Sequence, residues 1–146
     1  MMRGRGVRTV ERSTFYADQR GTVDVRAVRA YVREALAAVG DAAVLDDVEL
    51  MVGELVGNAV RYTASGQAGG SVTAMVGWGP DRVRVSITDD GGAVTRPRLV
   101  MTADLLEEGG RGLRMVATMA AAWGINLGPA PREEASVWFE VSINEG

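Results

Sequence analysis

Residues Ala42 to Thr63 read AAVLDDVELMVGELVGNAVRYT, and this stretch decides the fold because it predicts one long helix, from about Ala42 to Tyr62. Its apolar side chains recur at helical spacing and form one stripe: Leu45, Val48, Val52, Leu55, Val56 and Ala59. Glu54, Asn58 and Arg61 follow at intervals of four and three residues, so they share a face roughly opposite that stripe. Taken alone, this polar face is either a solvated surface or the floor of a site.

Changes of period predict the elements on either side. Apolar residues between Val25 and Val39 recur at helical spacing, and Gly40 ends this earlier helix. After the long helix the period becomes two, so residues 72–78 and 82–88 are predicted to form a hairpin around Gly79-Pro80-Asp81. The remaining elements are expected as a strand over Thr9–Tyr16, a helix from Leu113 to about Ala122 that Trp123-Gly124 ends, and strands over Ile125–Leu127 and Val137–Ile143.

This order of elements predicts an α+β two-layer sandwich, in which a mixed, mostly antiparallel sheet is covered on one face by about three helices. The strands do not alternate singly with helices, which argues against a Rossmann domain. A chain of 146 residues suits one domain. We expect that domain over residues 13–146, preceded by a flexible basic arm over residues 1–12.

The composition excludes several kinds of chemistry. The chain has no cysteine and no histidine, and all 16 basic residues are arginine. Thiol and Ser/His nucleophiles, a Walker A loop and lysine Schiff bases are therefore absent. The net charge of -3 does not indicate direct nucleic-acid binding. No stretch is long enough to span a bilayer and no secretory signal is present, so the expected location is the cytoplasm.

Glu54 and Asn58 form the first of three patches that are able to carry chemistry. A carboxylate serves as a general base, and a neighbouring amide carbonyl is able to hold a hard cation such as Mg²⁺.

The second patch is Asp89, at the end of a predicted strand, followed by Asp90-Gly91-Gly92. A carboxylate there accepts a hydrogen bond from an exocyclic amino group, although Asp-Gly pairs are also common in plain turns. The third patch is GGRGL, Gly109 to Leu113, at the start of a predicted helix. Backbone N–H groups at a helix start bind phosphate, but a flexible helix entry explains the glycines equally well.

The order and spacing of these patches resemble one family. ELVGNAV (Glu54–Val60), TDDGGA (Thr88–Ala93) and GGRGLRMV (Gly109–Val116) look like the N, G1 and G2 boxes of the GHKL ATPases, which include gyrase, MutL and histidine kinase catalytic domains. From about Phe15 to Val141 the chain is similar to the compact anti-sigma-factor serine/threonine kinases of actinomycetes. The resemblance implies the Bergerat-type ATP-binding variant of the predicted sandwich.

The resemblance also implies ATP and Mg²⁺ as ligands, with a role for each residue. Asn58 would hold the metal, Glu54 would be the catalytic base, and Asp89 would take the adenine amino group, supported by Gly91. The loop from Ala93 to Glu108 would be the ATP lid. Further ATP-binding positions would be Arg61, which positions phosphate or braces the lid, the G2-box residues Gly110, Arg111, Gly112 and Leu113, and Ser136, near the adenine end where the family usually has threonine.

Three departures from the family pattern bear on this reading. Ala93 replaces the last glycine of the G1 box, and alanine resists a positive φ at a hinge. Glu134 and Ala135 stand where the branch often has Gly-Lys, and Tyr62 stands where histidine is frequent.

The expected function is that of an ATP-binding anti-sigma factor and serine/threonine kinase, which binds a sigma factor and phosphorylates an anti-anti-sigma (STAS-type) partner. The resemblance also implies a homodimer. The alternative from a different class is a non-catalytic, nucleotide-responsive protein-binding module. A sensor histidine kinase fragment is disfavoured because the chain has no histidine to phosphorylate, and a scaffold without a ligand would need three matching patches by coincidence.

Overall fold

The computed structural model describes residues 9–62, 70–89, 111–127 and 135–143. The elements follow in the order β1 (Thr9–Tyr16), α1 (Val25–Ala35), the short 3-10 helix η2 (Ala37–Val39), α2 (Ala42–Tyr62), β2 (Ser71–Trp78), β3 (Arg82–Asp89), α4 (Arg111–Met119), β4 (Ala122–Leu127) and β5 (Ala135–Ser142).

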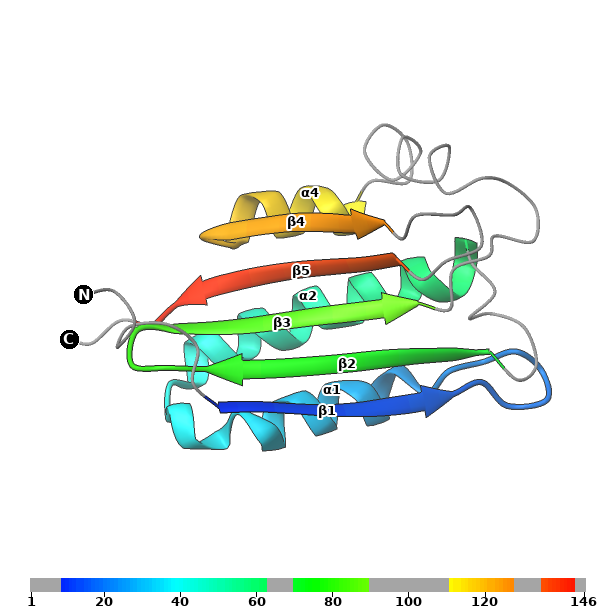
Figure 1. The fold of residues 1–146 in the computed structure, drawn as a ribbon, viewed down its shortest axis with the longest axis horizontal. Helices are drawn as coiled ribbons and strands as arrows, with labels where there is room; N and C mark the ends of the chain where they lie inside the picture. The colour runs from blue at the N-terminus through cyan, green and yellow to red at the C-terminus, as the bar shows by residue number, and fades with distance from the viewer. Residues whose placement is uncertain (1–8, 63–69, 90–110, 128–134, 144–146) are drawn as a thin grey trace.

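Within the described residues, the five strands form one sheet in the order β1-β2-β3-β5-β4, and all neighbouring strands are antiparallel. Helices α1, α2 and α4 cover one face of this sheet (Figure 1). The predicted α+β two-layer sandwich is therefore confirmed. The sheet is antiparallel throughout the described strands, which is the arrangement that hairpins and single crossovers produce.

Local sequence explains where the first two helices begin and end. The side chain of Asp24 caps α1 by accepting a hydrogen bond from the backbone N–H of Ala27 at 3.2 Å. Gly40, with a φ of 71°, adopts the left-handed conformation that ends η2. Asp41 then accepts a hydrogen bond from the N–H of Val44 at the start of α2. The predicted boundaries of the long helix, Ala42 and Tyr62, are confirmed.

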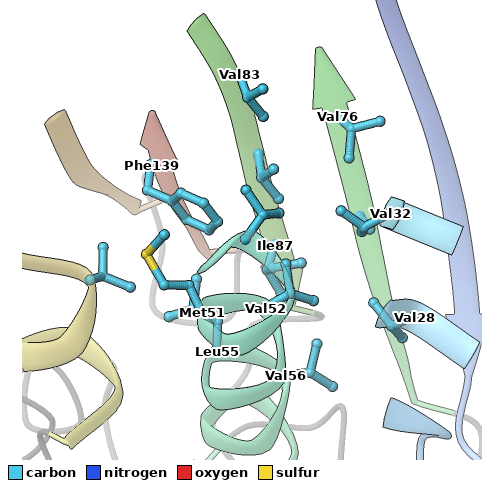
Figure 2. Packing of buried hydrophobic residues seen from close by; sticks show 14 of the residues in the cluster. Val28, Val32, Met51, Val52, Leu55, Val56, Val76, Val83, Ile87 and Phe139 are labelled. Atoms are coloured by element: carbon cyan, nitrogen blue, oxygen red, sulfur yellow. The ribbon is translucent and has the colours of Figure 1, made fainter. Parts of the chain in front are cut away.

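The core lies between α2 and the middle strands. Met51 and Val52 project from α2 toward Phe139 on β5 and Ile87 on β3, and Val56 lies on the side of α2 that faces Val28 of α1 (Figure 2). The predicted apolar stripe of α2 is buried throughout. Since α2 also contacts α1 on one side and α4 on the other, it is the central helix of the layer, and its position sets the position of Glu54 and Asn58.

Several boundaries differ from the sequence prediction. The helix predicted from Val25 to Val39 ends at Ala35 and is followed by the separate 3-10 helix η2. The helix predicted to reach Ala122 ends at Met119, and Trp123 and Gly124 lie inside β4. The N–H of Ala120 still donates to Val116 O at 2.8 Å, but the N–H of Ala121 donates to Glu140 O of β5 at 2.8 Å. Pairing with β5 thus overrides the helix propensity of the alanines.

At the N-terminus, residues 9–12 of the expected arm belong to β1 and pair with β2. Likewise, β5 begins at Ala135, two residues before the predicted Val137. Across the part of the chain that the structure describes, no helix combines the length and apolar character needed to cross a membrane.

Candidate functional site

The candidate site lies at one end of the sandwich. The C-terminal half of α2 and the C-terminal end of β3 point to that end, and α4 and β5 start there (Figure 1). The topology therefore brings the C-terminal half of α2, the end of β3 and the start of α4 to the same end of the sandwich, although they lie far apart in the chain.

Asn58 lies in the C-terminal half of α2 and is only 6% exposed, the one buried polar residue in the described ranges. Glu54, one helical turn earlier, is half-buried. A buried amide on a helix that otherwise buries aliphatic side chains is costly unless its polar atoms have partners. This burial argues against the plain solvated face that the sequence left open for Asn58.

Asp89 is the last residue of β3, and its place in the sheet decides which way it faces. It pairs with Val72, which is fully buried, and follows the buried Ile87 by two residues. Because side chains alternate along a strand, Asp89 belongs to the helix-covered side of the sheet. Asn58 and Asp89 thus occupy the same layer, at the same end of the molecule.

Ser136 belongs to the opposite face. Its hydroxyl lies 2.7 Å from that of Thr88, its cross-strand partner in β3, within hydrogen-bonding distance. The residue paired with Asp89 is Ala135. Ser136 is therefore at the expected end of the sheet, but the structure does not bring its side chain to the side where Asp89 and Asn58 lie. A shift of one residue moves a side chain to the other face. The alternation of Val137, Phe139 and Val141 already assigns Ser136 to the face away from the core, and the family position overrode that signal.

The G2-box segment is described in part. Helix α4 begins at Arg111, and Leu113 is fully buried in the core. Leu113 therefore anchors the start of α4 against α2, so that the helix begins at the same end as Asn58. The first N–H groups of a helix have no partner inside the helix, and at this position they are able to bind an anion. Gly112 lies in the first turn of α4.

Several predicted positions fall outside what the structure describes. These are Gly91, Gly110 and the Ala93–Glu108 segment in full, and the side chains of Arg61, Tyr62 and Arg111.

The described residues supply little for a metal ion by themselves. They contain no group of three or more His, Cys, Asp or Glu side chains able to hold one. Mg²⁺ does not require such a cluster, because it keeps several waters and is commonly bound through one or two protein oxygens plus substrate phosphates. The carboxamide oxygen of Asn58 would be such a protein ligand.

Ion pairs between α1 and α2 support the long helix. Arg33 of α1 donates to Asp46 at 3.0 Å and to Glu49, both on α2. These hydrogen bonds raise the pKa of Arg33 above its ordinary value. Arg33 is therefore engaged within the fold by acidic residues of α2.

Comparison with known proteins agrees with this geometry. A family model described as a histidine kinase-like ATPase domain matches residues 19–131. The chain has no match among curated proteins. The matched segment covers most of the chain and contains Glu54, Asn58 and Asp89. This chain belongs to the histidine kinase-like ATPase domain family.

Proposed function

We propose that this chain is an ATP-binding anti-sigma factor and serine/threonine kinase that phosphorylates an anti-anti-sigma partner. The observation that carries the proposal is the placement of Asn58 and Asp89 on the helix-covered side, at one end of the sandwich, in a chain of the histidine kinase-like ATPase family.

The proposed roles follow from the chemistry of each group. The Asp89 carboxylate accepts a hydrogen bond from the adenine amino group, and the start of α4 faces the phosphates with its N–H groups. Asn58 supplies an amide oxygen to Mg²⁺. When bound, Mg²⁺ neutralises phosphate charge during transfer.

Glu54 is the proposed base. It takes the proton of a serine or threonine hydroxyl on the partner as that oxygen bonds to the γ-phosphorus. The bond between that phosphorus and the β,γ-bridging oxygen breaks, and ADP leaves with the electron pair. A carboxylate one turn from Asn58 on the same helix suits this role, because the rigid helix holds the two groups at a constant separation.

The nucleotide site is tested by calorimetric titration of Mg·ATP into the purified chain and its Asn58→Ala variant. Asn126→Ala is the matched control, because Asn126 is an exposed amide on β4. We expect Asn58→Ala to weaken binding about tenfold or more, which is about 1.4 kcal/mol, and the control to bind like the wild type. Equal binding by all three proteins would remove Asn58 from the site.

The transfer step is tested by following label from γ-labelled ATP into a purified anti-anti-sigma protein. Glu54→Gln should abolish transfer while it leaves ATP binding nearly unchanged. Glu34→Gln, on the exposed face of α1, is the control. Full transfer by the Glu54 variant would show that another group is the base.

A non-catalytic, nucleotide-responsive binding module is the second candidate. The residue paired with Asp89 is an alanine, which brings neither a charge nor a hydrogen-bonding group to the adenine end. Tight Mg·ATP binding with persistent absence of transfer to the partner would favour this candidate. We also propose a homodimer, as the resemblance implies, and light scattering of the purified chain tests it.

A further inference from the structure

The face of α2 that is not buried runs directly past Glu54. Leu50, Gly53, Glu54 and Gly57 lie at spacings of three and four residues and therefore share this face. Leu50 is 46% exposed, one of few large apolar side chains exposed in the described ranges. A single exposed leucine is ordinary, but this one stands one turn from the proposed base.

Arg29 of α1 lies against the same face. A Cβ atom added at Gly53 would be 3.5 Å from Arg29 Nη1 and 3.6 Å from Arg29 Cδ. The side chain of Arg29 is half-buried and lies within van der Waals range of the Gly53 position. The arginine is consequently held beside α2 rather than extended into solvent.

The charge of Arg29 is not matched within the described residues. The acidic residues of α2 that face α1, Asp46 and Glu49, are both engaged by Arg33. Arg29 makes no ion pair or hydrogen bond with any described residue. Arg26, one turn earlier on α1, is exposed and likewise has none. Arg33 is thus paired within the fold, whereas Arg29, which lies beside Gly53, and Arg26, one turn away on α1, are not paired with any described residue.

We propose that Arg29, Leu50 and Gly53, together with Arg26, form the surface on which the phosphoryl-acceptor protein docks through an acidic segment. We name this surface the α1–α2 face. Charge complementarity selects the partner, because Arg26 and Arg29 attract carboxylates, while Leu50 contacts an apolar side chain of the same segment.

The location supplies the reason for such a surface. An acceptor hydroxyl must reach Glu54 with little freedom, since correct positioning provides much of the rate in phosphoryl transfer. Leu50, one turn before Glu54, and Arg29 of the adjacent helix α1 would contact the docked segment from two sides and so limit its movement. The identity of the docked protein as the acceptor rests on the proposed function, whereas its binding does not require transfer.

Fluorescently labelled peptides test the surface directly. Three serine peptides of equal length carry a leucine flanked by aspartates, by asparagines or by lysines, and anisotropy measures their binding at low ionic strength. We expect the wild type to bind the aspartate peptide about tenfold more tightly than the asparagine peptide. Arg29→Glu should lose that preference and favour the lysine peptide, and Leu50→Ala should weaken the aspartate peptide several-fold. Arg20→Glu, an equal charge change outside this face, should keep the wild-type order.

Equal weakening by Arg20→Glu and Arg29→Glu, or no discrimination by the wild type, overturns the proposal. Circular dichroism of each variant excludes loss of folding as the cause. Titration of Mg·ATP into the same proteins separates this proposal from the function. Peptide discrimination without ATP binding would refute the kinase function and retain the docking surface, and ATP binding without discrimination would do the reverse.

Discussion

Gly124 gives the sharpest test of how the sheet is packed. It lies in β4, directly across from Trp138 of β5. A Cβ atom added at Gly124 would lie 2.7 Å from Trp138 Nε1 and 2.9 Å from Cε2 and Cζ2. The guanidinium of Arg84 lies over the ring of Trp138 in a cation–π contact, with its Cζ 4.1 Å from the ring centroid. Gly124→Ala must therefore displace the indole and disturb this contact.

The expected loss follows from three contributions. Forcing a methyl group into filled space costs about 1–3 kcal/mol, and the cation–π contact contributes about 0.5–1 kcal/mol at a partly exposed site. Replacing glycine in a strand by alanine raises the free energy of unfolding by about 0.5–1 kcal/mol, because glycine loses more backbone freedom on folding. The net result is a lower free energy of unfolding by about 1–2 kcal/mol.

Urea unfolding followed by far-UV circular dichroism measures this change in a double-mutant cycle with Trp138→Ala. Without the indole the added methyl group has space, so Gly124→Ala should become neutral or slightly stabilising. The coupling energy between the two sites should be about 1–3 kcal/mol. Gly53→Ala is the matched control: its Cβ would make only ordinary contacts with Arg29, and relief of glycine in a helix should stabilise by about 0.5–1 kcal/mol.

A coupling energy below about 0.3 kcal/mol would refute the reasoning, because independent sites add within that margin. So would a Gly124→Ala protein as stable as the wild type.

Three further predictions concern stability. Met51→Ala should lower the free energy of unfolding by about 2–5 kcal/mol, since Met51 is fully buried, whereas Leu50→Ala next to it should change it by less than about 0.5 kcal/mol; equal effects would contradict the assigned core. Gly40→Ala should cost about 1–2 kcal/mol through its φ of 71° alone, because nothing lies within 4 Å of the added Cβ, and a neutral result in urea unfolding would contradict the left-handed cap. Tyr31→Phe should be neutral or stabilising by up to about 1 kcal/mol, because the Tyr31 hydroxyl is buried and has no hydrogen-bond partner among the described residues. Burial, and then the charge of Glu11, raise the pKa of Tyr31 above its usual value of 10.0. The stability that comes from this shift is complete below pH 10.0 and is lost as pH rises through the raised pKa. The wild type should therefore lose more stability in alkaline solution than Tyr31→Phe, and parallel losses of the two proteins would disprove this.

The local elements were largely predictable because their causes are local. Helical spacing located α2 to the residue, and the period of two located the β2–β3 hairpin. The prediction erred at the end of α4, where the residues 120–122 favour helix by propensity but Ala121 pairs with Glu140, 19 positions away. A backbone hydrogen bond between segments that are distant in sequence cannot be predicted from the local sequence of either segment.

For the candidate site, the sequence located the polar residues but not their faces. Spacing on α2 placed Glu54 and Asn58 together, yet only the packed structure distinguishes the buried Asn58 from the half-buried Glu54. Ser136, in a strand, is a different case. Its register against Thr88 turns it to the uncovered face, as the alternation of Val137, Phe139 and Val141 indicates, but the resemblance had assigned it to the adenine end.

The sequence by itself determined the kinds of chemistry open to this protein, its element types and its family. Composition, hydrophobic period and the order of the three patches are properties of the chain, and each is readable without coordinates. Only the packing of the whole chain sets Asn58, Asp89 and the start of α4 at one end of the sandwich, and pairs Arg33 with acidic residues of α2 while Arg29 has no such pair among the described residues. These facts depend on strand register and on the packing of α1 against α2, which arise from the sum of many weak contacts between distant residues.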